Sequence, residues 1–320
     1  MHANKVSVIV VSYNTREMTI DCLESVFEQT HRIPFELIVW DNASQDRSAE
    51  AIRERFRDRI QLAAGDRNLG FAVANNRAVE LASGDYLLLL NPDTIVLDGA
   101  IDELVEFAAA HPHAGIWGGR TVFPDGTLNP ASCWQRQTPW SLFCQASGLS
   151  SMFRRSTLFN PEGLGGWNRS GTRSVDIVTG CFLLIRRDMW LALGGFREEF
   201  FMYGEEADLC LRARKLGAKP IVSSAATIIH YGGASEKVRA DKMVRLLKAK
   251  RLLIYFHFTE LTRKIGSQLL FLWPVTRYLS HSVLAAFGKA SSKDRRDVWL
   301  EIVRRRKEWF DLEAQKRIAG

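Results

Sequence analysis

The sequence predicts an α/β protein with a mainly parallel central sheet flanked by helices, followed by a helical C-terminal extension. Short runs rich in Val, Ile and Leu alternate with amphipathic stretches over the first 119 residues, which is typical of strand–helix–strand units. Polar residues follow several of these runs, as at the ligand-binding edge of a parallel sheet. The net charge also changes sign near residue 236, which indicates a distinct C-terminal region.

The expected strands are apolar enough to be buried on both faces, as parallel strands between two helical layers are. They cover residues 6–13, 35–40, 60–64, 85–90 and 114–119. The stretches between them place apolar residues at helical spacing. These expected helices cover residues 17–29, 48–56, 71–82 and 100–110.

The regular alternation stops after residue 119. Residues 120–171 contain a Pro-Asp-Gly turn and have no clear period, so we expect a variable lid or insertion there. Residues 175–196 predict a strand that enters a short helix, and residues 198–217 predict a further helix. The first turn of that helix is acidic, a pattern that the helix dipole alone would favour.

The charge distribution divides the chain. Residues 237–264 hold nine Lys or Arg against two Asp or Glu, residues 289–320 hold ten against six, and Arg277 adds one positive charge. Because the whole chain carries +7, residues 1–236 carry −5. We therefore expect an acidic globular domain over residues 1–236 and a basic amphipathic helical region over residues 237–320.

Cysteine usage and the N-terminus favour a cytoplasmic protein. Five cysteines without a C-x-x-C pair indicate neither a disulfide framework nor a zinc ribbon. The N-terminus lacks the features of a signal peptide and predicts a first strand instead. No stretch reaches the roughly 18 uninterrupted apolar residues of a spanning helix.

The most apolar part of the C-terminal region is residues 268–287, which Pro274, Arg277 and His281 interrupt. Such a stretch could lie on the inner face of a membrane, with Trp273 and Tyr278 as interfacial anchors and the surrounding basic residues attracted to anionic lipids. The alternative is a helical subdomain whose apolar residues form its core.

Four polar loops follow the expected strands, at residues 12–14, 41–44, 67–70 and 91–93. Any one of them could be an ordinary turn or helix cap. Together they lie where open α/β sheets bind ligands. The first strand–helix turn has no G-x-G-x-x-G, and the chain has no P-loop, so another device must hold phosphates. A carboxylate at a strand end that binds a divalent cation is such a device.

The motifs in these loops and beyond them resemble those of family 2 glycosyltransferases, closest to the bacterial rhamnosyltransferase-type enzymes. The resemblance covers about residues 5–235 in unbroken order. It is carried by VSVIVVSYN, VWDNAS, RNLGFAVANN, LLLLNPDT, VTGCFLLIRR, FFMYGEEADLCLR and IIHYGGAS. It implies a GT-A catalytic domain over residues 1–236 and inverting transfer from a nucleotide-diphosphate sugar.

The resemblance also implies roles for the polar loops in donor binding. The residues concerned are Tyr13, Asp41, Asn42, Arg67, Asn68, Gly70, Asn75, Asn91 and Asp93. Asp41 and Asn42 would bind base and ribose, and Tyr13 and Arg67 would line the nucleotide pocket. Asn68, Gly70 and Asn75 would shape the donor loop, Gly70 by letting the backbone approach the nucleotide. Asn91, Pro92 and Asp93 match the family's D-x-D motif, with asparagine in place of the first acid.

The same resemblance implies a divalent cation, Mn²⁺ or Mg²⁺, bound by Asp93 with His230 as a further ligand. The acceptor hydroxyl needs a general base for in-line attack on the anomeric carbon. The family's base maps to Glu206, with Glu205 as the alternative and Asp208 as an orienting group. A histidine at a strand end is also often structural.

The expected function is therefore transfer of a sugar, rhamnose from dTDP-rhamnose in the closest subset, to a lipid-linked or growing saccharide in cell-surface polysaccharide synthesis. Another nucleotide sugar is one alternative. A non-catalytic scaffold is a second, although the retained Asp93 and Glu206 speak against it. A nucleic-acid-binding protein is a third, but the domain over residues 1–236 is acidic and the basic region lacks an interleaved aromatic motif, so no nucleic acid partner is expected.

Overall fold

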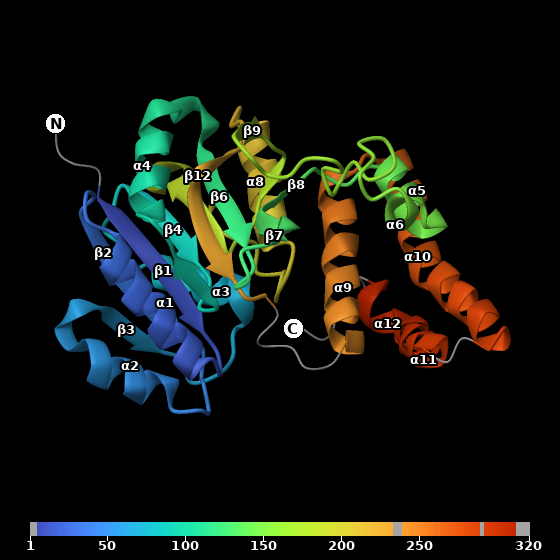
Figure 1. The fold of residues 1–320 in the computed structure, drawn as a ribbon, viewed down its shortest axis with the longest axis horizontal. Coiled ribbons are helices and arrows are strands. Elements are labelled where there is room, and N and C mark those ends of the chain that lie inside the picture. The colour runs from blue at the N-terminus through green and yellow to red at the C-terminus, as the bar shows by residue number, and fades with distance from the viewer. Residues whose placement is uncertain (1–4, 233–238, 289–290, 312–320) are drawn as a thin grey trace. The chain divides into compact units, whose positions relative to one another are not determined.

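A computed structural model describes residues 5–232, 239–288 and 291–311, and its chain folds into two compact units (Figure 1). The described residues of the first unit are 5–134, 168–201 and 205–232. Those of the second are 135–167, 202–204, 239–288 and 291–311. Much of the expected lid over residues 120–171 therefore belongs with the C-terminal helices.

The first unit is built on a mixed, mainly parallel sheet. Its strands are β1 (Val6–Ser12), β2 (Phe35–Asp41), β3 (Gln61–Ala64), β4 (Tyr86–Leu90), β5 (Thr94–Val96), β6 (Ile116–Val122), β7 (Leu128–Asn129), β8 (Cys133–Trp134), β9 (Thr172–Ser174), β10 (Ile177–Val178), β11 (Phe182–Arg186) and β12 (Ile221–His230). Among the described residues, ten strands form one sheet in the order β3-β2-β1-β4-β11-β6-β12-β5, with β7 beside β6 and β9 beside β12. Strands β8 and β10 pair separately.

Strand β11 is reversed in the middle of the sheet, and β5 is reversed at its edge, where it pairs antiparallel with β12. Strands β1 to β4 are mutually parallel where they pair, whereas β11 runs antiparallel to both of its neighbours, β4 and β6. The five strands expected from the first 119 residues are present as β1 to β4 and β6. The mainly parallel α/β sheet is thus confirmed, while the insertion of β11 between β4 and β6 was not predicted.

The register brings the strand ends to one edge. Ser12 pairs with Asp41, Asp41 with Ala64, and Val10 with Leu90, so the polar loops after β1 to β4 all begin at that edge. Because β11 is antiparallel, it starts at the same edge, with Phe182 opposite Leu90.

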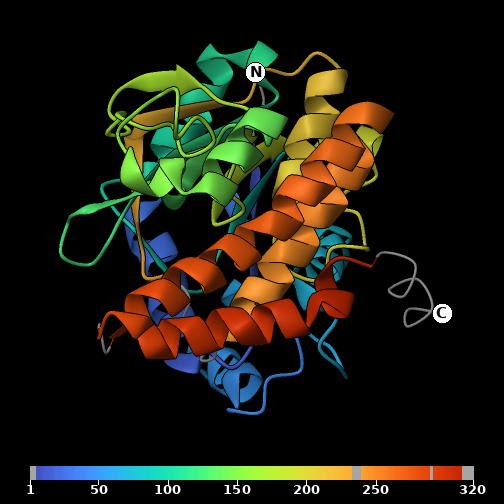
Figure 2. The same ribbon diagram turned by 90° about the vertical axis from the view of Figure 1, so that its right-hand side faces the viewer.

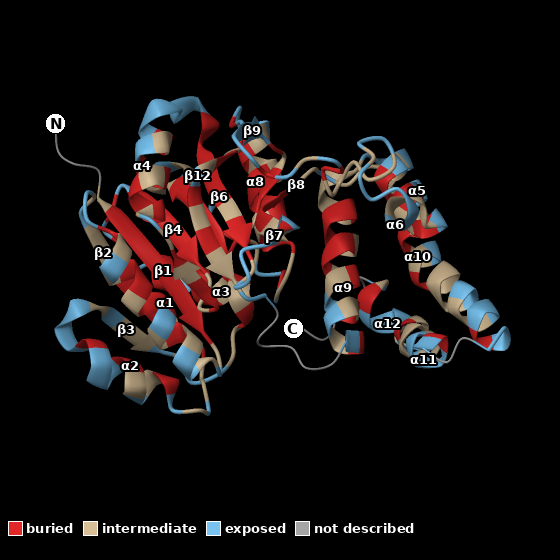
Figure 3. Cartoon of the chain, in the orientation of Figure 1, coloured by how far each residue is buried: buried red, intermediate tan, exposed pale blue. Residues whose placement is uncertain are grey.

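Helices cover both faces of this sheet. They are α1 (Arg16–Gln29), α2 (Ser48–Phe56), α3 (Gly70–Val79), α4 (Ala100–Ala110), α7 (Arg187–Leu193) and α8 (Glu205–Lys215), with short 3-10 turns at Arg57–Arg59, Pro112–Ala114 and Pro130–Ser132. Alternate strand residues such as Val8 and Leu88 pack with α1, α2 and α4 in one core cluster. The intervening residues Ile9 and Leu89 are equally buried and point to the opposite face. Figure 3 shows the central strands as almost continuously buried.

The second unit is helical (Figure 2). It comprises α5 (Pro139–Ser147), α6 (Leu149–Met152), α9 (Arg239–His257), α10 (Glu260–Ala286), α11 (Ser291–Arg304) and α12 (Arg306–Trp309). Its core contains Leu142 from α5 together with Leu247, Leu270, Ile302 and Trp309 from the C-terminal helices. The sequence therefore predicted the C-terminal helices but missed α5, which completes their core.

Polar contacts hold α5 in this unit. The Thr276 hydroxyl donates to the carbonyl of Ala146 at 2.6 Å. Glu162 accepts a hydrogen bond from Gln145 at 2.6 Å and forms an ion pair with Lys250 of α9. Both groups of the ion pair are largely buried, so residues 135–167 are an integral part of the helical unit.

The C-terminal region contains a packed helical core, as one of the two interpretations of its sequence expected. Trp273 is partly buried against that core, with its ring centroid 6.5 Å from that of Trp299. The expected membrane anchors Trp273 and Tyr278 are both partly buried, and their role at a membrane stays a prediction. Across the described ranges, none of the helices has the length and hydropathy needed to cross a bilayer.

Candidate functional site

The loops after β2 and β3 are braced against each other. The Asn42 side-chain amide donates to Asn68 Oδ1 at 3.0 Å, and Asn42 Oδ1 accepts from the backbone of Leu69 at 2.9 Å. Asn68 Oδ1 also accepts from the backbone of Gly70 at 2.9 Å. The side chains of Asn42 and Asn68 therefore set the shape of the loop that leads into α3.

Gly70 occupies a position that only glycine fits. Its φ is +77°, and a Cβ there would lie 2.6 Å from the ring of Phe201. The neighbouring Phe71 donates its backbone N–H to the carbonyl of Phe201 at 2.7 Å. Contact with Phe201 thus accounts for Gly70 without the expected approach to a nucleotide. Asn75, also expected at the donor, is 1% exposed and donates to the carbonyl of Phe71 at 2.8 Å.

Asp41 has an oxygen that remains available for a ligand. One carboxylate oxygen accepts from the backbone of Ser44 at 3.0 Å, whereas Oδ1 is buried and has no hydrogen-bond partner. Tyr13, partly buried, and Arg67, exposed, lie in the loops on either side of the strand that Asp41 ends. A ligand that donates a hydrogen bond to Asp41 would satisfy its free oxygen.

Asn91, Asp93 and His230 meet where β4 ends and β12 ends. His230 pairs with Thr94 across the β12–β5 ladder, which places its ring beside Asp93. His230 Nε2 lies 3.4 Å from Asp93 Oδ1 and 3.5 Å from the Asn91 side-chain nitrogen. The backbone N–H of Asn91 donates to the carbonyl of Cys181 at 3.1 Å, which ties this loop to the start of β11.

These three side chains suit a divalent cation. Asn91 Oδ1 is buried without a hydrogen-bond partner. Adjacent ligands of an octahedral Mg²⁺ or Mn²⁺ lie about 3 Å apart, because each metal–ligand bond is about 2.1 Å. The Asp93–His230 separation is close to that spacing. Within the described ranges no cluster of three or more His, Cys, Asp or Glu forms a complete cage, so phosphate and water oxygens would have to supply the remaining positions.

His230 is electrostatically coupled to its surroundings. Burial alone would lower its pKa, but the adjacent Cys181 and the hydrogen bond with Asp93 raise the pKa to about 11. In the absence of a cation, a protonated imidazole therefore balances the Asp93 carboxylate. Metal binding at this position would release that proton.

The acidic turn of α8 contains three carboxyl groups in different environments. Asp208 is completely buried, and its oxygens lie 2.6 Å from Arg212 Nε and 3.3 Å from Arg197 Nε. Arg212 also donates to the carbonyls of Leu193 and Gly195, each at 2.7 Å. These contacts join α8 to the end of α7, so Asp208 stabilises the packing of these two helices.

Glu205 is 4% exposed, and its Oε2 has no hydrogen-bond partner. Burial raises the pKa of Glu205 well above its ordinary value, and the charge of Glu206 adds to the effect, so this environment favours the neutral form of Glu205. Glu206 is partly buried. A Cβ added at Gly180 would lie 3.8 Å from the Cβ of Glu206, so the two residues are neighbours. Since Gly180 precedes Cys181, Glu206 lies at the same edge of the sheet as Asn91.

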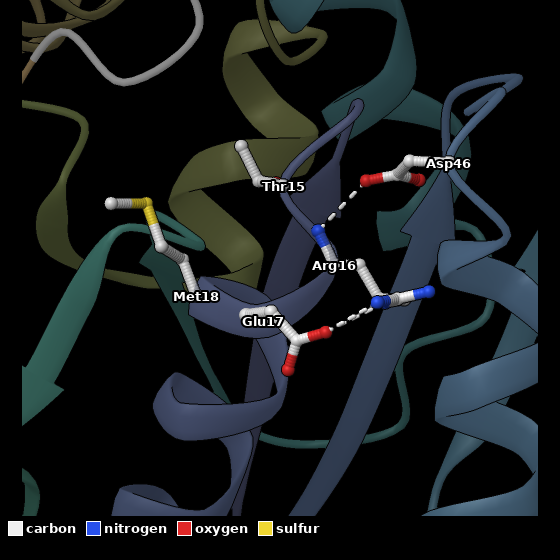
Figure 4. Close-up of a pocket in the computed structure, with 5 residues that line it drawn as sticks. All are labelled: Thr15, Arg16, Glu17, Met18 and Asp46. Atoms are coloured by element: carbon white, nitrogen blue, oxygen red, sulfur yellow. Dashed lines mark hydrogen bonds and ion pairs between the residues drawn. The ribbon is translucent and has the colours of Figure 1, made fainter.

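A hollow of about 400 Å³ lies at the start of α1 (Figure 4). It is lined by Thr15, Arg16, Glu17, Met18 and Asp46. Asp46 accepts the backbone N–H of Arg16 at 2.9 Å, which joins the loops after β1 and β2. None of the expected donor residues lines this hollow.

Four residues that organise the site were missed by the sequence analysis: Asp46, Asn129, Cys181 and Phe201. The side chain of Asn129 donates to the carbonyl of His230 at 3.1 Å. Only Asp46 had a local signal, because it precedes Ser48 at the start of a helix, where Asp commonly accepts backbone N–H groups. The other three act through contacts with residues far away in sequence.

The α/β sheet and its carboxylate-lined edge define a nucleotide-sugar-binding type of fold. Residues 7–190 match the family described as glycosyl transferase family 2, and the chain belongs to that family. The expected family is thereby confirmed.

Two curated relatives match most of this chain. The O-antigen biosynthesis protein RfbC of Myxococcus xanthus is 29% identical over 238 residues, 74% of this chain and 18% of that protein. The N-acetylglucosaminyl-diphospho-decaprenol L-rhamnosyltransferase of Mycobacterium tuberculosis is 28% identical over 245 residues, 70% of this chain and 75% of that enzyme. The chain thus spans less than a fifth of the first relative and three quarters of the second.

Solved structures show the same fold. The mannosyltransferase PcManGT from Pyrobaculum calidifontis, in complex with GDP-Man and Mn²⁺, has a TM-score of 0.60 at 16% identity and covers 97% of this chain and 88% of its own. S. aureus TarS 1-349 in complex with UDP-GlcNAc has a TM-score of 0.51 at 17% identity, covering 93% and 81%. The GT-A fold class expected from the sequence is confirmed.

Proposed function

We propose that this protein transfers a sugar from a nucleotide-diphosphate donor to a saccharide acceptor with inversion of the anomeric carbon, with the help of a divalent cation. The observation that carries the proposal is the set Asn91, Asp93 and His230 at the carboxyl edge of the sheet, with Glu206 at the same edge. Family membership supplies the reaction class.

The donor residues divide into two groups. Asp41, with its free oxygen, would accept a hydrogen bond from the base or ribose, and Tyr13 and Arg67 would line the nucleotide pocket. The remaining expected donor residues hold the loop in shape through the contacts that they make with each other and with α3. These residues are Asn42, Asn68, Gly70 and Asn75.

The cation would be held by Asp93 and His230, with Asn91 Oδ1 as a possible third ligand atom, and it would neutralise the leaving diphosphate. Glu206 would take the proton from the attacking acceptor hydroxyl. Glu205, whose neutral form burial favours, would add no second negative charge beside Glu206, and Asp208 would fix the helix that carries both.

The names of two relatives support a proposal for the sugar and the acceptor. The mycobacterial relative is named as an L-rhamnosyltransferase that acts on a diphospho-decaprenol lipid, and the Myxococcus relative as an O-antigen biosynthesis protein. We therefore propose rhamnose from dTDP-rhamnose as the donated sugar and a lipid-linked or growing saccharide of a cell-surface polysaccharide as the acceptor. With such an acceptor, we propose that the protein works on the cytoplasmic side, at the inner face of the membrane, with the region of residues 237–320 in contact with it.

The test is release of nucleoside diphosphate from a panel of nucleotide sugars, each with Mn²⁺, with Mg²⁺ and with chelator. We expect turnover with dTDP-rhamnose that depends on the cation. Turnover with a different nucleotide sugar alone would replace rhamnose in the proposal. The absence of turnover with every donor and acceptor would favour the scaffold alternative.

The Asp93→Asn variant tests the cation assignment. We expect it to fold normally and to lose cation-dependent turnover by at least about a hundredfold, because it removes the negative charge that holds the cation. Asp98→Asn is the matched control, since Asp98 is exposed and lies five residues away in the same segment. Unchanged activity and Mn²⁺ dependence in Asp93→Asn would contradict the assignment.

A further inference from the structure

The second unit carries an exposed aromatic patch formed by Trp140, Phe143, Met152, Phe153 and Leu158. These side chains are between 42% and 75% exposed. The rings of Trp140 and Phe143 stack with centroids 5.5 Å apart. Apolar side chains that gather in this way on a surface commonly mark an interaction site.

The aromatic patch continues onto α10. Thr276 and Arg277 of α10 hydrogen-bond to α5 and to Ser151, which places α5 and α6 along this helix. On α10, Leu272, Leu279 and Val283 recur at helical spacing and are 44%, 54% and 57% exposed.

This α10 stripe ends at Phe287, which is 85% exposed. In Figure 3 the C-terminal half of α10 is mostly exposed or partly buried. The aromatic patch and the α10 stripe together form one apolar face, and both belong to the second unit.

The charged residues near this apolar face indicate what kind of surface it binds. Residues 126–161 and 261–288 contain no Asp or Glu. Arg154 and Arg155, both exposed, lie directly beside Met152 and Phe153 of the patch. The stretches that form this face thus carry basic residues without acidic ones, and such an apolar surface complements a layer of anionic phosphate over hydrocarbon.

Trp140 strengthens this interpretation. Its indole N–H already donates to the carbonyl of Leu158 at 2.7 Å, although the ring is 43% exposed. The ring can therefore enter an apolar medium without leaving its donor unsatisfied.

We propose that this apolar face binds the surface of a bilayer that contains anionic phospholipid. The aromatic patch, from residues 140–158, supplies interfacial aromatic side chains in addition to the expected anchors Trp273 and Tyr278. The proposal rests on the proposed function in one respect, since a lipid-linked acceptor explains why an enzyme of this kind would dock on a membrane.

The experiment is flotation of the full-length protein with vesicles of phosphatidylcholine, with and without phosphatidylglycerol. We expect wild type to float with the anionic vesicles at low salt and to bind more weakly as salt screens the arginines. The double variant Met152→Asp with Phe287→Asp should lower binding by at least about tenfold, because it places charge at two exposed points of the face. The matched control is Leu191→Asp with Leu216→Asp, two similarly exposed leucines of the first unit, at 63% and 61%.

A second variant separates charge from apolar contact. Arg154→Gln with Arg155→Gln should reduce the preference for anionic vesicles without abolishing binding, because the apolar face remains. All variants should keep nucleoside diphosphate release in solution. Wild type that floats with anionic vesicles but releases no nucleoside diphosphate from any donor would count against the proposed function and leave the membrane surface standing.

Wild type that ignores anionic vesicles at low salt would overturn the proposal, as would equal flotation of the Met152→Asp, Phe287→Asp variant and its control. Light scattering measures the oligomeric state of the protein in solution and tests a second possible ligand for this face. A wild-type dimer that does not float, and that this variant converts to a monomer, would assign the face to a second copy of the chain and overturn membrane docking.

Discussion

Asp208 provides the sharpest test of which acidic residues of α8 act on substrate and which hold the helix. Asp208→Asn keeps the shape of the side chain but removes its charge, leaving Arg212 and Arg197 without their carboxylate. Arg212 is 13% exposed and Asp208 is 0% exposed, whereas Arg197 is 39% exposed and partly solvated. The Arg212 contact should therefore account for most of the effect.

The magnitude follows from that burial. Removing one partner of a buried ion pair costs about 3–5 kcal/mol, while an exposed pair contributes less than about 1 kcal/mol. Because the asparagine oxygen can still accept from Arg212, we expect a loss near the lower end, about 3 kcal/mol. A domain of this size loses about 2–4 °C in Tm per kcal/mol, so the Tm should fall by roughly 6–12 °C.

The assay is urea unfolding followed by circular dichroism, with nucleoside diphosphate release measured at a temperature where the variant is folded. Asp188→Asn is the control, because Asp188 forms an exposed pair with Arg186 and should change stability by less than about 1 kcal/mol. Asp208→Asn with an unfolding free energy like that of wild type and activity reduced a hundredfold would refute this reasoning and make Asp208 a catalytic residue.

The other predictions concern the same edge of the sheet. Glu206→Gln should lower kcat by about a hundredfold or more with little change in donor affinity, and Glu205→Gln should do less; the reverse ranking in steady-state kinetics would contradict the base assignment. Since burial raises the pKa of Glu205 in the folded protein above the ordinary value of 4.5 that it has in the unfolded chain, this residue makes stability fall as pH rises above 4.5. Glu205→Gln should therefore have a higher unfolding free energy than wild type at pH 8 but not at pH 4. If urea unfolding gives the same difference between variant and wild type at both pH values, Glu205 is ionised in the folded protein. Gly70→Ala should cost more than about 2 kcal/mol, since a left-handed backbone and the Phe201 contact both oppose a Cβ, and a smaller loss in urea unfolding would show that Phe201 can move.

The sequence predicted the parallel part of the sheet because its strands are buried on both faces and therefore read as continuous apolar runs. Residues 182–186 of β11 form an equally apolar run, but an apolar run carries no information about direction or neighbours. Helix α5 was missed because its residues lack a clear apolar period. Its capping box, in which Thr138 and Ser141 exchange hydrogen bonds, was a readable local signal.

The candidate site shows the same limit. The loops that hold Asp41 and Asp93 could be found from the sequence, because each directly follows a strand. That Asn42 and Asn75 are occupied by backbone contacts, whereas Asp41 has an unpartnered oxygen, depends on distances that no local pattern encodes. The roles of Asp208 and Glu205 likewise depend on what surrounds each carboxyl after folding.

The antiparallel strand β11 has a consequence for the order in which the chain can fold. Strand β4 gains its second neighbour only when residues 182–186 arrive, more than ninety residues later in sequence, and the strand that carries His230 comes later still. Pairing β4 with β11 closes a long loop, and this closure costs conformational entropy before the new contacts form. We therefore expect β1 to β4 to assemble well before the sheet is complete. During synthesis the edge of β4 would therefore remain unpaired and could pair with an incorrect strand. Asp93 would contact His230 only in one of the last folding steps. Sugar transfer would thus begin only once nearly the whole catalytic sheet has been synthesised and closed.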